Sequence, residues 1–244
     1  WGALIYMLKF TGFPKPLELP RARTRTLSAY DWTLGAVLVL TLAWVVWYKY
    51  VTGTFVYLFQ PCHIVSAMLI YLCLCTDYRK GSLMFAVFTH VNVGTLLAIG
   101  FPDTRDYYRR AYYPEFTVAN FFVLHYLLAL LPLYYEWSGI FKFRKSLYAN
   151  VFGWILLGVF HWSILLPVSI VAENNLNYIM SPPPKGPLIR LGVMYRSAQT
   201  VATLPMVMVP GLLFPFIIRV LKTVLGAKSA IKPSPLRKSS RTTK

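Results

Sequence analysis

Long apolar runs, separated by short polar stretches, recur along almost the whole of this 244-residue chain. Six of them come close to the roughly 20 residues that a helix needs to cross the hydrocarbon of a bilayer. Their boundaries are set to within about 2–4 residues. The pattern predicts an all-α, polytopic transmembrane helical bundle of about six spanning helices. The predicted spans are 31–50, 53–75, 82–101, 116–135, 147–171 and 203–220.

The segments on either side of these spans have a different composition and divide the chain into three parts. Residues 1–30 begin with the apolar stretch WGALIYMLKF, interpreted as the remnant of a truncated helix, followed by a basic linker. Residues 31–220 form the predicted transmembrane domain. Residues 221–244 are basic and contain serine and proline, which predicts a disordered cytosolic tail that anchors the topology or binds anionic lipid headgroups.

The charge of the chain supports a membrane protein. Hydrophobic residues make up 57% of the sequence and charged residues 14%, against about 25% charged residues in a soluble domain. The net charge of +17 comes from Lys and Arg in the connections and the tail, so no nucleic-acid partner is expected. Well over half of the 25 Lys and Arg residues lie on the side that carries the basic linker and the tail, which places that side in the cytosol.

The three cysteines are Cys62, Cys73 and Cys75. Their odd number and the lack of a CxxC motif argue against a disulfide framework or a structural zinc site. Cys73 and Cys75 fall at the predicted cytosolic end of their span, where we expect them to serve as packing residues or, as the alternative, as palmitoylation sites.

Ionisable side chains inside spanning helices are rare and usually functional. Measured from the non-cytosolic ends at 1.5 Å per residue, Cys62, His90, His125 and His161 all fall about 14–17 Å deep. We therefore expect a thiol and three imidazoles at a similar level. His63 projects about 100° away from Cys62 on a continuous helix and is expected to be a poor base for it.

Three functions remain open on this evidence. A thiol beside an imidazole can transfer an acyl group through a thioester, and an apolar surrounding would exclude water. Asn92 and Asn120 could then donate to the oxyanion. Three histidines and a thiol could instead hold haem or another metal in a membrane oxidoreductase, although no HxxxH or CxxCH spacing is present. The third possibility is a small-solute transporter without catalysis.

Three motifs resemble those of the transmembrane protein 164 family: QPCH at 60–63, FHWS at 160–163 and VAENNLN at 171–177. The resemblance implies an acyltransferase that places polyunsaturated acyl chains on ether-linked phospholipids, in a fold similar to the androgen-induced membrane hydrolases. It also implies that Cys62 is the nucleophile and His125 the base. Gln60 stands where the family has asparagine, and 196–200 lacks the histidine that the family places before Gln-Thr, so the acyl-chain preference is not carried over.

Together these observations predict an acyltransferase that moves a fatty acyl group between glycerophospholipids through a thioester on Cys62, with His125 as the general base. We expect no metal or cofactor, membrane phospholipids as substrates, and a multi-pass location in the endoplasmic reticulum or Golgi. A further set of polar residues is predicted to bind substrate or support the pair, with the last three at the non-cytosolic mouth. These residues are His90, His161, Asn92, Glu173, Asn175 and Asn177.

Overall fold

The computed structural model describes residues 23–143, 147–182 and 187–224. The predicted helix remnant at the N-terminus and the tail from residue 225 onward lie outside these residues. Within the described ranges the chain is helical, and its only β-type pairing is an isolated bridge between Thr24 and Asp77. The all-α fold class predicted from the sequence is confirmed.

Three helices are single, unbroken elements of spanning length: α2 (Ala29–Val51), α7 (Pro114–Ser138) and α10 (Tyr195–Val224). A fourth span is composite, with α8 (Leu147–Phe160), the π-helical turn η2 (His161–Leu165) and α9 (Leu166–Val171) running on as one element. Four helices in the described ranges are therefore long and apolar enough to cross a membrane, or five if one bent pair counts as a span.

The bent pair is α4 (Tyr78–Val91) followed by α5 (Val93–Gly100), with a change of direction of 44° between them. Asn92 lies at the break. Its Nδ2 donates to the carbonyl of Leu128 on α7 at 2.8 Å, and its Oδ1 accepts a hydrogen bond from the Thr95 hydroxyl. Asn92 thus supports the bend and ties it to α7, instead of presenting its amide to Cys62 as expected.

The second predicted span differs from expectation. The chain from Gly53 begins with a turn and the 3₁₀-helix η1 (Phe55–Phe59), and α3 (Pro61–Leu74) starts only at Pro61. Gln60 is extended, with φ −60° and ψ 140°, because a proline disfavours helical backbone in the residue before it. Pro61 lacks a backbone N–H, which costs nothing in the first turn of a helix because N–H groups there have no partner within the helix. The continuous helix predicted over 53–75 is therefore wrong.

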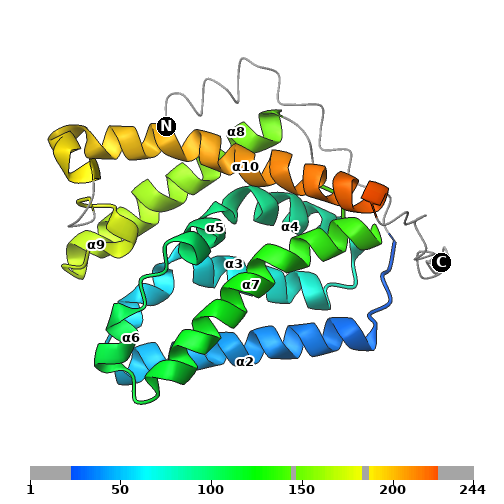
Figure 1. The fold of residues 1–244 in the computed structure, drawn as a ribbon, viewed down its shortest axis with the longest axis horizontal. Coiled ribbons are helices and arrows are strands. Elements are labelled where there is room, and N and C mark those ends of the chain that lie inside the picture. The colour runs from blue at the N-terminus through cyan, green and yellow to red at the C-terminus, as the bar shows by residue number, and fades with distance from the viewer. Residues whose placement is uncertain (1–22, 144–146, 183–186, 225–244) are drawn as a thin grey trace, which may run out of the picture.

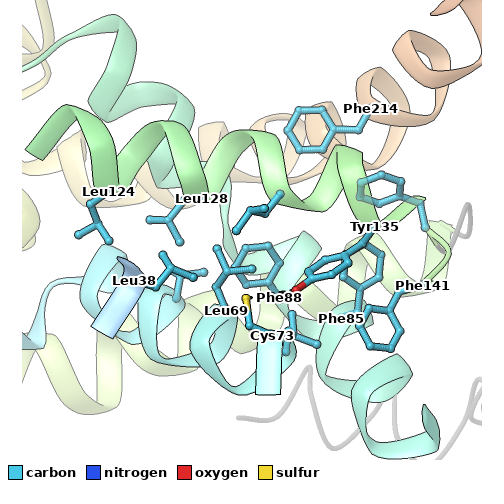
Figure 2. Packing of buried hydrophobic residues seen from close by; sticks show 14 residues of the cluster. Leu38, Leu69, Cys73, Phe85, Phe88, Leu124, Leu128, Tyr135, Phe141 and Phe214 are labelled. Carbon is cyan, nitrogen blue, oxygen red and sulfur yellow. Dashed lines mark hydrogen bonds between the residues drawn. The ribbon is translucent and has the colours of Figure 1, made fainter. Parts of the chain in front are cut away.

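The helices pack in a chain of neighbours, α2 on α3, α3 on α4, α4 on α8 and α8 on α10, while α7 crosses α2, α3 and α5 (Figure 1). The main core lies between α2, α3, α4 and α7 and is built from aliphatic and aromatic side chains, with Phe214 of α10 at its edge (Figure 2). Leu38, Leu69, Leu128 and Phe85 are fully buried in it. This core fixes α3 against α7, the two helices that carry Cys62 and His125.

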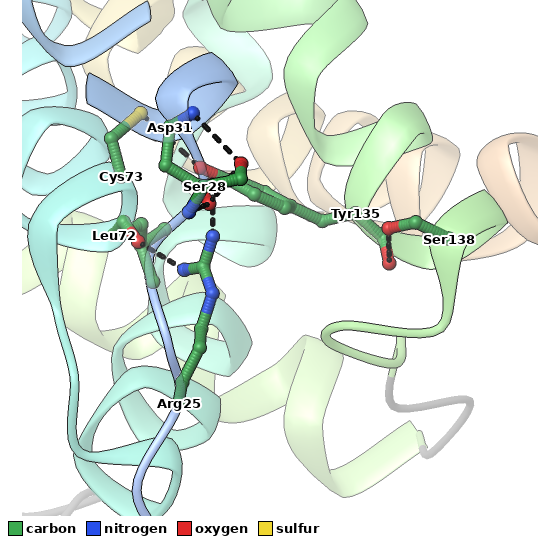
Figure 3. Close-up of polar contacts among 7 residues, drawn as sticks. All are labelled: Arg25, Ser28, Asp31, Leu72, Cys73, Tyr135 and Ser138. Atoms are coloured by element: carbon green, nitrogen blue, oxygen red, sulfur yellow. Dashed lines mark hydrogen bonds and ion pairs between the residues drawn. The ribbon is translucent and has the colours of Figure 1, made fainter. Parts of the chain in front are cut away.

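A polar cluster fastens the linker before α2 to this core (Figure 3). Arg25 forms an ion pair with Asp31 and donates from Nη1 to the carbonyl of Leu72 at 3.0 Å. Ser28 and Asp31 form a capping box, in which the Ser28 hydroxyl accepts from the Asp31 N–H at 3.2 Å. Cys73 lies beside this cluster and accepts from the Tyr135 hydroxyl at 3.2 Å.

Cys73 and Cys75 are both buried, as expected of packing residues.

Candidate functional site

The connections that follow α2, α5 and α9 gather at one end of the bundle. Tyr48 of α2 stacks edge-on against Tyr107 of the short helix α6 (Arg105–Arg110), with ring centroids 5.5 Å apart. Tyr57 donates to Asn174 Oδ1, just beyond α9, at 3.2 Å. These contacts agree with the predicted topology, in which the connections after the first, third and fifth spans lie on the same side of the membrane. Which end faces the cytosol stays a prediction.

A small cavity of about 40 Å³ lies near this end, between α2, α3, α6 and α7. A void of this size holds a few water molecules, since one water needs about 10–15 Å³ of such space. Cys62 and His125 both line it, so the two residues predicted as a catalytic pair do share one site. The complete lining is Val45, Tyr48, Lys49, Gln60, Cys62, His63, Tyr107, Thr117, Asn120, Phe121, Leu124 and His125.

Cys62 is the second residue of α3 and is half-buried. The first turn of a helix presents backbone N–H groups and the positive end of the helix dipole, which stabilise negative charge on a side chain there, whereas burial of the Cys62 sulfur acts in the opposite direction. The sequence-based depth of Cys62 assumed a helix that began at Gly53, and that assumption is wrong.

His125 lies on α7 and is 3% exposed. Its Nδ1 is 2.7 Å from the carbonyl oxygen of Phe121, one turn earlier. Because a carbonyl only accepts, Nδ1 carries the proton, and the neutral ring has its lone pair on Nε2. Within the described part of the chain, Nε2 has no hydrogen-bond partner. An imidazole in this tautomer can remove a proton from a group in the cavity.

The cavity contains further polar groups. His63 lines it beside Cys62, and its buried Nδ1 has no hydrogen-bond partner among the described residues. Asn120 also lines it, with Nδ2 donating to the carbonyl of Thr41 at 3.1 Å. Burial raises the pKa of the Tyr107 phenol, and the negative charge of an ionised Cys62 raises the pKa further, so Tyr107 stays protonated and can donate a hydrogen bond.

His90 does not line the cavity. It lies on α4 against α8, where Gly153 approaches so closely that an added Cβ would be 2.3 Å from the His90 Cβ. Both ring nitrogens of His90 and the Oδ1 of Asn150 are buried without a hydrogen-bond partner in the described ranges. The expected support of Cys62 by His90 is therefore not seen.

His161 is also separate from the cavity. It opens the π-helical turn η2, and its Nδ1 donates to the carbonyl of Leu157 at 2.7 Å. Its Nε2 accepts from Asn177 Nδ2 at 2.8 Å, so both ring nitrogens are satisfied. The three imidazoles predicted at one depth do not converge on Cys62, and the described residues contain no group of three or more His, Cys, Asp or Glu placed to hold a metal ion.

The polar segment after α9 forms a compact turn. Asn175 Nδ2 donates to the carbonyl and hydroxyl oxygens of Ser181, both at 2.8 Å, and its Oδ1 accepts from the Met180 N–H at 2.8 Å. Glu173 is exposed, with a left-handed φ of 52°. Asn175 therefore shapes the turn and Asn177 holds His161, while a headgroup-binding role for Glu173 stays a prediction.

Comparison with known proteins identifies the family of the chain. A profile of the TMEM164 family matches residues 3–214, which is most of the chain. The chain belongs to the TMEM164 family. It is also 29% identical over 133 residues to the transmembrane protein 164 homolog of Dictyostelium discoideum. That match covers 53% of this chain and 45% of the relative, so the chain spans less than half of the relative's length. No solved structure is significantly similar.

Sequence reasoning missed three cavity residues of this TMEM164-family chain: Lys49, His63 and Tyr107. Lys49 is a charged residue at the end of an apolar run, a position that also suits a simple topology signal. His63 was set aside because of its 100° offset, but the cavity lies across the end of α3, where successive residues can both reach it. Tyr107 lies in a connection, for which apolar periodicity gives no signal.

Proposed function

We propose that this TMEM164-family protein is a membrane-embedded acyltransferase that moves a fatty acyl group between glycerophospholipids through a thioester on Cys62. One observation carries the proposal: a thiol at a helix N-terminus lines the same small cavity, inside an apolar bundle, as an imidazole whose Nε2 has no hydrogen-bond partner among the described residues. A nucleophile and a base from different helices are the minimum for covalent acyl transfer.

In the first half-reaction, Cys62 Sγ attacks the ester carbonyl of the donor lipid while His125 Nε2 takes the thiol proton. The resulting tetrahedral oxyanion needs hydrogen-bond donors. We assign this role to the Tyr107 hydroxyl and the second N–H of the Asn120 amide, two of the side-chain donors that line the cavity. When the intermediate collapses, the ester C–O bond breaks, and the departing lysolipid oxygen takes the proton from His125.

In the second half-reaction, the hydroxyl of an acceptor lysophospholipid attacks the thioester, and His125 Nε2 takes the hydroxyl proton. The C–S bond breaks, and the sulfur regains its proton from His125. The free space of about 40 Å³ admits few water molecules, which favours transfer to an alcohol over hydrolysis. It is too small for an acyl chain, so the chain must extend along the lipid-facing surface or widen the cavity.

The test is acyl transfer by the purified protein in liposomes that contain a diacyl phospholipid donor and a lysophospholipid acceptor, either ester- or ether-linked. Cys62→Ala and Cys62→Ser should reduce transfer to background while the protein stays folded. Cys75→Ser is the matched control, because Cys75 is a buried cysteine away from the cavity whose Sγ–H bond to the Asp77 carbonyl a hydroxyl can replace. Transfer that persists at the original rate in both Cys62 variants would refute the proposal.

A further inference from the structure

Lys49 is a buried cation with no carboxylate at ion-pairing distance in the part of the chain that the structure describes. It lies in the last turn of α2 and is 6% exposed, with its ammonium group 5.2 Å from the centre of the Tyr57 ring. The ion pairs found in the described ranges are Arg25–Asp31 and Arg105–Asp103, and neither involves Lys49. Burying an ammonium group is costly unless a negative charge compensates it, and an aromatic face does so only in part.

The lining of the cavity narrows the choice of compensating anion. None of the twelve lining residues is Asp or Glu. The lining groups that can become negative are the thiol of Cys62 and the phenols of Tyr48 and Tyr107. The thiol is the most acidic of these, by about 1.5 pH units in unperturbed side chains. Asp106 of α6 attracts Lys49 as well, but it is exposed and does not line the cavity.

We propose that Lys49 is the charge partner of Cys62 and stabilises its thiolate, together with the N-terminal end of α3. The other titratable groups around the sulfur are Tyr48 on α2, His63 on α3, Tyr107 on α6 and His125 on α7. The two imidazoles and two phenols are neutral in their ordinary states near neutral pH, which leaves the Lys49 ammonium as the cation of the lining. In this arrangement His125 removes the proton and Lys49 compensates the charge left on sulfur.

This inference deepens the proposed function, because it takes Cys62 as the nucleophile. Its test measures thiol reactivity in the absence of lipid substrate, so the two proposals can fail separately. The probe is iodoacetamide, applied to the full chain in detergent over a range of pH, with alkylation quantified on the peptide that contains Cys62. Lys49 and Cys62 line the same cavity of about 40 Å³, and a nearby opposite charge changes the acidity of a group by about 1–3 pH units.

Lys49→Met should therefore slow the alkylation of Cys62 at pH 7.5 by about tenfold or more, and the rate should reach half its plateau at least about one pH unit higher. Lys49→Arg, which keeps the charge, should stay within about threefold of the original rate. The matched control is Lys222→Met. Lys222 also lies in the last turn of its helix, with its ammonium group 5.7 Å from the centre of the Trp137 ring. It does not line the cavity. Its loss should leave the Cys62 rate unchanged.

An unchanged rate and pH profile in folded Lys49→Met would overturn the inference. If that variant does not fold, the unsubstituted protein gives a second test: Cys62 should favour the anionic reagent iodoacetate over iodoacetamide more than free cysteine does. A ratio at or below that of free cysteine also overturns it. Slower alkylation in Lys49→Met by a protein that transfers no acyl group would support the charge pair and refute the acyltransferase. Loss of acyl transfer in Lys49→Met with unchanged alkylation of Cys62 would refute the charge pair and support the acyltransferase.

Discussion

The close approach of α8 to α4 at Gly153 gives a prediction whose size follows from the structure. A Cβ added at Gly153 would lie 2.3 Å from the His90 Cβ and 3.4 Å from the His90 Cα. Ordinary contacts of a Cβ begin near 3.4 Å, so the helices would have to separate by roughly 1 Å. A rotamer change of His90 cannot relieve this contact, because the clashing atom is its Cβ.

Gly158 on the same helix is the matched control, since a Cβ there meets nothing within 4 Å. Overpacking a close contact costs about 1–3 kcal/mol. Replacing glycine by alanine in a helix gains up to about 1 kcal/mol at either position. Gly158→Ala should therefore be as stable as the unsubstituted protein or more so, and Gly153→Ala should be about 1–3 kcal/mol less stable than Gly158→Ala.

The assay is thermal unfolding of both variants in the same detergent, followed by tryptophan fluorescence. One kcal/mol corresponds to about 2–4 °C for a protein of this size, so Gly153→Ala should melt at least about 2 °C below Gly158→Ala. Equal melting temperatures would contradict the tight contact between α4 and α8 at His90, and with it the placement of His90 away from Cys62.

Two further predictions concern the ends of the bundle. Arg25→Met leaves Asp31 as a buried carboxylate without its cation and should lower the free energy of unfolding by about 3–5 kcal/mol in the same assay. Arg23 is exposed, so the control Arg23→Met should have little effect. A small loss of stability in Arg25→Met would contradict the ion pair. His125→Gln should lower acyl transfer by about 10²–10⁴-fold, because it removes the base. His161→Gln should lower acyl transfer far less, because both ring nitrogens of His161 are already hydrogen-bonded. Comparable losses in the two variants would contradict the assignment of the base to His125 and not to His161.

The helices with long uniform apolar runs could be predicted from the sequence. The spans predicted at 31–50, 116–135 and 147–171 lie within or match Ala29–Val51, Pro114–Ser138 and the composite element that ends at Val171. In each, run length alone decides the outcome, because about 20 apolar residues are needed to cross a bilayer. Even the π-helical turn leaves the length of the composite span unchanged.

The second span could not be predicted from apolar character, because residues 53–60 are as apolar as many helical residues. The local signal was Pro61, which favours the first turn of a helix and an extended residue before it. The prediction of one continuous helix over 53–75 instead placed Cys62 in mid-helix. The bend at Asn92 had no comparable signal, since it depends on a hydrogen bond to Leu128 of another helix.

The resemblance to the TMEM164 family, and not the depth calculation, indicated Cys62 and His125, and the structure places both residues at one cavity. The depth calculation for Cys62 started from the wrong residue. The same calculation placed His90 and His161 at that level, where they do not join the pair. Depth along a helix axis does not determine which face a side chain occupies, and a side chain's partners depend on helix rotation and crossing. The position of Lys49 in the cavity could not be predicted for the same reason, because a lysine at the end of a span is buried or exposed according to its neighbours.

The central claim is that Cys62 carries the acyl group between donor and acceptor. The most direct measurement is peptide-mapped mass spectrometry of the protein after incubation with a diacyl phospholipid and no acceptor. We predict an acyl adduct on Cys62 that hydroxylamine removes, that disappears when lysophospholipid is added, and that does not accumulate in His125→Gln. Transfer that proceeds with Cys62 unmodified throughout would contradict the account.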